Sequence, residues 1–243
     1  MRPRFSLPTL TVLAAVALTG CGADRPESAS EPSPTASPSA SPTASPSAGP
    51  LTDAVLLTDD DTAFTDGADW FRVATGDADL DGHGDLAHPC LPEGLAGTGA
   101  SSVVRADFEL RTTTDPAAEV SGDRLVELVA AYADEDAASA ALARVGELVA
   151  GCPERPAALT EHRALQTRDV DVPGAEATIL DAHLGPVPVE LDPTGDAAYI
   201  VETGLLRRGS TLVVLTSVVV GQDYGFTGGT PVERMLPRAA HRL

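Results

Sequence analysis

The sequence predicts an α+β fold, a twisted and mostly antiparallel sheet packed by helices, in a single domain that spans residues 51–243. Two β-branched runs, 197–206 and 211–220, flank a short Arg-Arg-Gly-Ser connection, a pattern typical of an antiparallel hairpin. Helical patterns lie before and after the predicted strands, without the regular strand–helix alternation that produces a parallel sheet. The length of this region suits one domain with its own core.

Three earlier segments also have strand or helix patterns. Residues 103–110 alternate between apolar and polar side chains, which predicts a strand, and residues 175–184 form a second predicted strand. Residues 125–133 are ambiguous, because propensity favours a helix while the apolar run also fits a buried strand.

Two helices are predicted from their start signals and spacing. Asp134-Glu135-Asp136 is an acidic helix start, followed by one apolar stripe that continues to Cys152: Ala138, Ala141, Leu142, Val145, Leu148 and Val149. The second helix begins at Thr230-Pro231-Val232-Glu233, a capping-box pattern with proline at the first helical position, and runs towards Leu243. Pro237 should limit its regularity.

Residues 1–21 have the form of a lipoprotein leader. A short basic stretch precedes the apolar run 5–18, which is too short to remain as a membrane-spanning helix. The ending Leu18-Thr19-Gly20-Cys21 resembles the lipobox of bacterial lipoproteins. We therefore expect residues 1–20 to be a signal peptide and Cys21 to carry diacylglycerol and palmitate, which anchors the protein on the outer face of the cytoplasmic membrane. The alternative is an ordinary secreted protein that is cleaved elsewhere.

Residues 21–50 are expected to be the lipidated cysteine and a disordered tether. Within residues 33–46, proline recurs every four residues among Ser, Thr and Ala, with no large apolar side chain to offset the entropy of ordering. In a polyproline II conformation, at ~3.1 Å per residue, such a tether would reach at most roughly 90 Å.

The composition also bears on partners. The formal net charge is −20, whereas nucleic acids and anionic lipid surfaces select for basic patches. We therefore expect no nucleic-acid partner, and membrane contact only through the lipid anchor. The expected partner is an unknown small ligand or an envelope protein, bound by a monomer.

The chain has three cysteines, Cys21, Cys90 and Cys152. If Cys21 is lipidated, the other two can form one disulfide, which fits an oxidising extracytoplasmic location. Two buried free thiols are the alternative.

One local motif has the ligand spacing of a calcium-binding loop, the segment 77–85. Its ligands would be the carboxylates of Asp77, Asp79 and Asp81, the carbonyl of His83 and, through water, Asp85. The pattern departs at its twelfth position, where His88 replaces the expected acid, so Ca²⁺ affinity should be weak. A solvated acidic loop is the alternative, and no other cofactor is expected.

The sequence contains no recognisable catalytic motif. It lacks a Gly-x-Ser-x-Gly elbow, a Ser-x-x-Lys and a His-Glu-x-x-His, and the predicted disulfide would consume both thiols of the domain. Trp70 and Phe71 precede the acidic loop. Core packing is the first interpretation of this pair, and an aromatic wall of a ligand cleft is the second.

The order of features along the domain is informative. Trp70 and Cys90 are followed by the segment 97–108, a Val-Glu-Leu-Val run, and an Ala-rich helix that ends at Cys152. A Val-rich hairpin, Gly221-Gln222-Asp223 and a terminal helix close the chain. This order resembles the extracellular sensor domain of some actinobacterial serine/threonine kinases and of related free-standing lipoproteins.

The resemblance implies a twisted antiparallel sheet packed by helices, a disulfide that tethers a helix, a cleft considered to bind ligand, and no known catalysis. The chain departs from the kinase-linked form in two respects: it has no kinase region, and its cysteines allow one disulfide where that form has two. We therefore expect a cell-surface lipoprotein with a non-catalytic, sensor-like domain that binds a ligand or a partner. An extracytoplasmic hydrolase, whose triad assembles only in the fold, is the alternative from another class, and a scaffold without a small-molecule ligand is the third.

The lipobox interpretation predicts the effect of Cys21→Ala. Without the thiol that accepts the lipid, the protein should move from the membrane fraction to unprocessed or soluble forms. Detergent-phase partitioning of the two proteins measures this, and equal membrane partitioning of variant and wild type would contradict lipidation at Cys21.

Overall fold

The structure is a computed structural model. It describes residues 50–64, 68–77, 91, 94–95, 97–112, 115–119, 123–151, 160–221 and 229–243. The three cysteines and most of the predicted cation ligands (Asp79, Asp81, His83 and Asp85) lie outside these residues, so lipidation, the disulfide and the calcium site stay predictions. No helix within the described ranges is long and apolar enough to cross a membrane.

The centre of the domain is an eight-stranded sheet in which every pairing between described strands is antiparallel. Its order is β1-β2-β4-β8-β7-β6-β5, and the short β3 also pairs with β2. The strands are β1 (Ala68–Asp77), β2 (Ser102–Thr112), β3 (Asp115–Glu119), β4 (Arg124–Ala131), β5 (Thr160–Asp169), β6 (Glu176–Gly185), β7 (Tyr199–Arg208) and β8 (Thr211–Val220). The predicted antiparallel sheet packed by helices is therefore confirmed.

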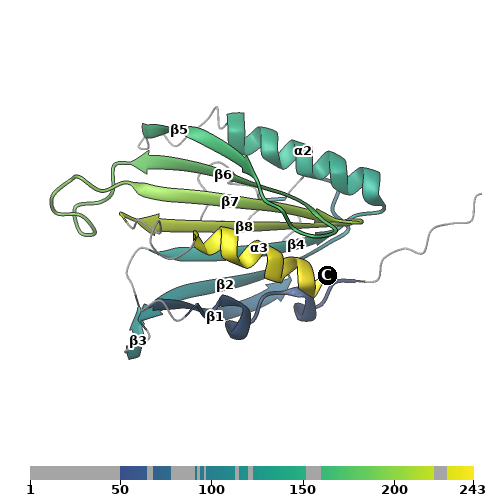
Figure 1. Cartoon of the computed structure of the whole chain (residues 1–243), viewed down its shortest axis with the longest axis horizontal. Helices are drawn as coiled ribbons and strands as arrows, with labels where there is room; N and C mark the ends of the chain where they lie inside the picture. The colour runs from purple at the N-terminus through teal and green to yellow at the C-terminus, as the bar shows by residue number, and fades with distance from the viewer. Residues whose placement is uncertain are drawn as a thin grey trace, which may run out of the picture. The chain divides into compact units, whose positions relative to one another are not determined.

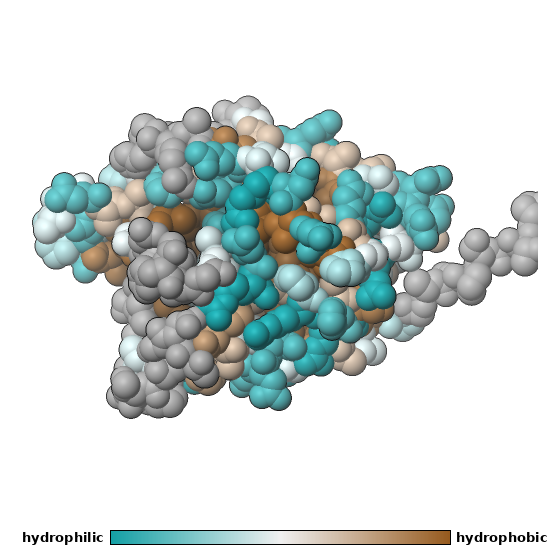
Figure 2. Space-filling model, viewed as in Figure 1, coloured by the Kyte–Doolittle hydropathy of each residue, from teal (hydrophilic) through white to brown (hydrophobic). Residues whose placement is uncertain are grey.

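Helices cover both faces of this sheet (Figure 1). Helix α2 (Glu135–Gly151) packs on one face through five buried residues of the predicted stripe, and α3 (Pro231–Arg242) packs on the other. The 3-10 turn η1 (Asp53–Val55) and the short helix α1 (Asp59–Thr62) lie on the α3 side. Seen from this side, the surface over α3 is mainly hydrophilic, with smaller hydrophobic areas beside it (Figure 2).

Of the two interpretations of residues 125–133, the buried strand is correct and the helix that propensity favours is wrong, because residues 125–131 belong to β4, an interior strand of the sheet. Alternate residues face opposite sides of a strand, and both sides of β4 are buried: Leu125 and Val129 lie in the α3-side core, and Leu128 lies in the α2-side core. A strand covered on both faces has a continuous apolar sequence, which its pattern alone does not distinguish from a buried helix.

Three strands were not predicted, β1, β3 and β5. Strands β1 and β5 are the two ends of the sheet order, and each has a break in register with its neighbour. The short β3 pairs with β2, also with a break in register. Edge strands with bulges lack a clean apolar alternation, so their conformation depends on pairing with the next strand.

Helix α3 lies close to the sheet at Gly204 of β7. A Cβ atom at this position would lie 2.5 Å from Val232 Cγ1 and 3.0 Å from Leu236 Cδ2. The absence of a side chain therefore sets the distance between the helix and the sheet.

Gly204→Ala should lower the free energy of unfolding by about 1–3 kcal/mol, because the added methyl group overlaps two buried side chains of α3. For a domain of this size the melting temperature should fall by several degrees. Gly76→Ala in β1 is the matched control, since a Cβ there meets nothing within 4 Å. Equal melting temperatures for the two variants would contradict the close contact at Gly204.

Candidate functional site

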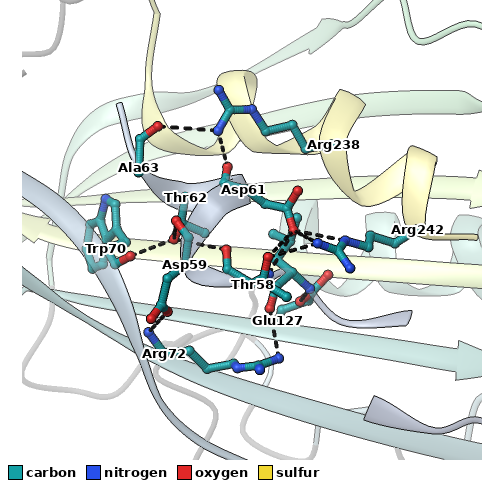
Figure 3. Close-up of polar contacts among 11 residues, drawn as sticks. Thr58, Asp59, Asp61, Thr62, Ala63, Trp70, Arg72, Glu127, Arg238 and Arg242 are labelled. Atoms are coloured by element: carbon teal, nitrogen blue, oxygen red, sulfur yellow. Dashed lines mark hydrogen bonds and ion pairs between the residues drawn. The ribbon is translucent and has the colours of Figure 1, made fainter. Parts of the chain in front are cut away.

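Three arginines lie on one side of α3 because they are spaced four residues apart: Arg234, Arg238 and Arg242, here called the arginine face. They contact the segment 51–64, here called the strap, which contains η1 and α1. Figure 3 shows Arg238 and Arg242 extending from α3 to this segment. The strap is the part of the domain that directly follows the predicted tether.

Arg242 binds the first turn of α1. Its Nε and Nη2 atoms lie 2.9 and 2.5 Å from Asp61 Oδ2, and Nη2 also donates to Thr58 Oγ1 at 2.8 Å. Thr58 donates to the same carboxylate oxygen from its backbone N and its hydroxyl, at 2.8 Å each. Partial burial raises the pKa of Asp61, but the hydrogen bonds from Thr58 and Arg242 together hold it below its ordinary value.

The rest of the arginine face holds the end of the strap. Arg238 donates to the carbonyl oxygens of Asp61 and Ala63. The guanidinium carbons of Arg234 and Arg238 lie 3.8 and 4.8 Å from the centre of the Phe64 ring, within the range of cation–π attraction.

Beneath the strap, Leu56 and Leu57 are fully buried in the core. The backbone N of Leu57 donates to Glu127 Oε2 at 2.8 Å, and its carbonyl accepts from Arg72 Nη1 at 3.1 Å. Thr62 Oγ1 donates to the carbonyl of Trp70 at 2.5 Å. The strap therefore connects the edge strand β1, the central strand β4 and helix α3.

Glu127 is the most unusual residue of this group, because it is a carboxyl in the middle of the sheet with 0% exposure. Its Oε1 atom has no hydrogen-bond partner among the described residues. Burial raises its pKa to about 8, and nearby Asp61 adds to this, while the Leu57 amide, Arg242 and Arg72 act in the opposite direction. Most Glu127 side chains are thus protonated at neutral pH.

A second buried carboxyl lies under the start of α3. Glu202 of β7 is 4% exposed, and Arg168 of β5 connects it to Glu233 of α3 through distances of 3.4 and 3.2 Å. Burial raises the pKa of Glu202 to about 7, and Asp181 adds to this, while hydrogen bonds from Thr230 and Arg168 lower it. Thr230 is also the N-cap of α3, since its hydroxyl accepts from Glu233 N at 3.2 Å.

The start of α3 is therefore joined to the buried Glu202 through Thr230 and through Arg168, which also contacts Glu233, and its last turn is joined to the strap, which covers the buried Glu127. Burial raises the pKa of both carboxyls, so ionisation of either one opposes the packing that buries it. In the part of the chain that the structure describes, no three His, Cys, Asp or Glu side chains converge in a way that would hold a metal ion. The described contacts hold the helix and the strap against the sheet.

Of the site residues predicted from sequence, the structure describes Trp70, Phe71 and Asp77. Trp70 is in the α3-side core with 2% exposure, in the packing role that was its first interpretation. Phe71 faces the other side of β1, where the Arg111 guanidinium lies 5.6 Å from its ring centre. Asp77 is exposed at the end of β1, and its four predicted partners are not among the described residues.

Two features of the sequence pointed to the polar contacts around α3 and the strap. Glu127 is an acid within an apolar run, and the arginine spacing of the last helix is regular. Neither signal identifies its partners, because the strap and α3 lie at opposite ends of the domain sequence. Arg208, which the sequence places at a hairpin tip, likewise donates to the carbonyl of Ala240 in α3, at 2.6 Å.

Replacing Glu127 by Gln should change how stability depends on pH. The folded-state pKa of Glu127 is raised, so its contribution to stability is fully present below its unfolded pKa of about 4.5 and is lost as the pH rises through about 8. Gln is neutral throughout and still offers an acceptor to Leu57. We therefore expect the free energy of unfolding, measured with urea from pH 5 to pH 9, to fall less steeply with pH in Glu127→Gln than in the wild type. The two slopes can differ by at most about 1.4 kcal/mol per pH unit, because one ionising group is removed. Parallel curves for both proteins would contradict the raised pKa.

Comparison with known proteins gives similarity at the level of structure. No protein-family model matches the sequence, and no curated protein matches it. The structure is similar to the extracellular domain of PknH from Mycobacterium tuberculosis, with 10% identity, a TM-score of 0.43, and coverage of 79% of this chain and 98% of that chain. It is also similar to an Rv0999 ortholog from Mycobacterium smegmatis, with 10% identity, a TM-score of 0.36, and coverage of 75% and 97%. The extracellular domain in the first comparison is of the kind that the sequence resembles, and at 10% identity this similarity does not establish a shared activity.

Proposed function

We propose that this chain is a lipid-anchored protein of the outer face of the cytoplasmic membrane, and that its domain is a non-catalytic, sensor-like module that binds a small ligand or an envelope protein. The lipobox-like ending at Cys21 and the Pro-rich segment up to residue 50 support the anchor and the tether. The domain itself supports a binding role through the structure around α3.

The observation that carries the proposal is that the two buried carboxyls, Glu127 and Glu202, are covered by the domain's own chain and bonded to it. A general acid or base must reach the proton that it transfers, directly or through one water. Glu127 is covered by the strap, and Glu202 is covered by α3, where each hydrogen-bonds to the domain's own chain. Their perturbed pKa values are therefore explained by helix packing, which favours a structural role over catalysis.

The same groups favour a sensor. A sensing element needs two arrangements of similar free energy whose balance a ligand can shift. Helix α3 is held at both ends by side-chain contacts, which a ligand, a partner or a proton can replace. Its last turn contacts the strap, and the strap continues into the tether, so a change at α3 would reach the membrane-proximal side of the domain.

The proposal predicts a bound species on the native protein. The full chain, extracted from its own membrane in mild detergent, should carry a non-covalent mass in native mass spectrometry or retain a co-purifying envelope protein. It should also melt at a higher temperature than the same protein after urea denaturation, dialysis and refolding, because a ligand stabilises the folded state by mass action.

Two results would contradict this function. The first is identical mass and melting temperature for the extracted and refolded proteins, with no retained partner. The second is catalytic conversion of the bound species to a product, which would favour the hydrolase alternative.

A further inference from the structure

The strap differs from the rest of the domain in how it is attached. No ladder pairing of the described strands includes residues 51–64, and the backbone hydrogen bonds of η1 and α1 are internal to the strap. The described polar contacts to the sheet and to α3 each use a side chain from one of the two sides, as at Arg242 and Arg72. The strap can therefore leave the domain without breaking a hydrogen bond between two strands of the sheet.

Ion pairs and hydrophobic burial hold the strap in place. Asp61 and Arg242 are both partly exposed, so their attraction is weakened by solvent. The main apolar contribution comes from the side chains of Leu56 and Leu57, which are fully buried. Two leucine side chains bury much less apolar surface than the strands of the core, so exposing them costs less free energy than unfolding the sheet.

Glu127 opposes this attachment when it is ionised. Oε2 accepts the Leu57 amide, but Oε1 has no partner among the described residues, so a negative charge there is poorly compensated. The charged groups that face it are Asp61 from α1, Arg242 from α3 and Arg72 from β1. With the strap open, the carboxylate would be hydrated and its charge would no longer be penalised.

We infer that the strap opens as a unit while the sheet stays folded, and that ionisation of Glu127 shifts the strap towards the open state. Opening would join residues 51–64 to the tether and free the arginine face of α3. The inference concerns this chain alone, so it depends on neither the lipid anchor nor a bound ligand.

Amide hydrogen exchange of the full chain in detergent tests the inference. In the closed strap the amides of Leu57 and Phe64 donate hydrogen bonds to side chains of the sheet, to Glu127 and Asp69. After correction for intrinsic exchange rates, they should exchange faster than the amides of β7 and β8, and with little dependence on urea. The opening constant, the ratio of open to closed strap, should rise by at least about tenfold between pH 6 and pH 8. It should rise by less than a hundredfold, since a single ionising group changes it by at most a factor of ten per pH unit.

Three variants separate the effect of Glu127 ionisation from that of Glu202 ionisation and from that of the Asp61–Arg242 contact. Glu127→Gln should abolish the rise with pH, whereas Glu202→Gln, the matched change at the other buried carboxyl, should leave it intact. Asp61→Asn should open the strap more at every pH, because it weakens the contact with Arg242.

Several outcomes would overturn the inference. Strap amides that exchange only together with β7 and β8 would show that the strap does not open separately. A rise with pH that persists in Glu127→Gln would exclude Glu127 as the controlling group. Should Glu127→Gln fail to fold, the wild type still decides: a strap opening constant that is unchanged from pH 6 to pH 8 would refute the inference.

Discussion

The close packing of α3 on the sheet is the constraint from which the other features of the domain follow. The helix buries Val232, Met235, Leu236, Ala239 and Ala240, and Gly204 allows it to approach without a side chain between the two layers. Helix and strap exclude water from the sheet surface beneath them. Glu127 and Glu202 lie on that surface, so their negative charge becomes unfavourable and their pKa values rise. Hydrogen bonds from Leu57 and Thr230, and the nearby arginines, partly offset this rise.

Arginine is scarce relative to acid in this chain, which has 16 Lys and Arg residues against 36 Asp and Glu. Several of these arginines are concentrated around α3. Arg168 connects two acids at the start of the helix, Arg208 donates to a carbonyl near its end, and the arginine face binds the strap. The local charge balance therefore fixes where helix and strap meet, while the excess of acid keeps the exposed surface negative.

The position of the strap relates this packing to the proposed function. In the proposed function the tether joins the domain to its lipid anchor, and the strap is the first described segment after the predicted tether. The strap contacts the central strand, an edge strand and the last helix at once. A ligand, a partner or a proton that alters α3 would thus alter the segment that follows the proposed tether in the sequence, while the strand pairing of the sheet stays intact.

Local patterns in the sequence determined the features that depend on neighbouring residues: the hairpin β7–β8, strands β2 and β6, and both long helices, including the cap at Thr230. The lipobox-like leader and the tether stay predictions from the same kind of pattern. The tertiary structure alone decided that residues 125–131 are a strand, since burial on both faces removes the alternation that identifies one. It also decided the edge strands, whose conformation comes from pairing with their neighbours. The role of Glu127 was likewise invisible in sequence. A pKa depends on which distant residues exclude water from a carboxyl, and here those residues come from the two ends of the domain.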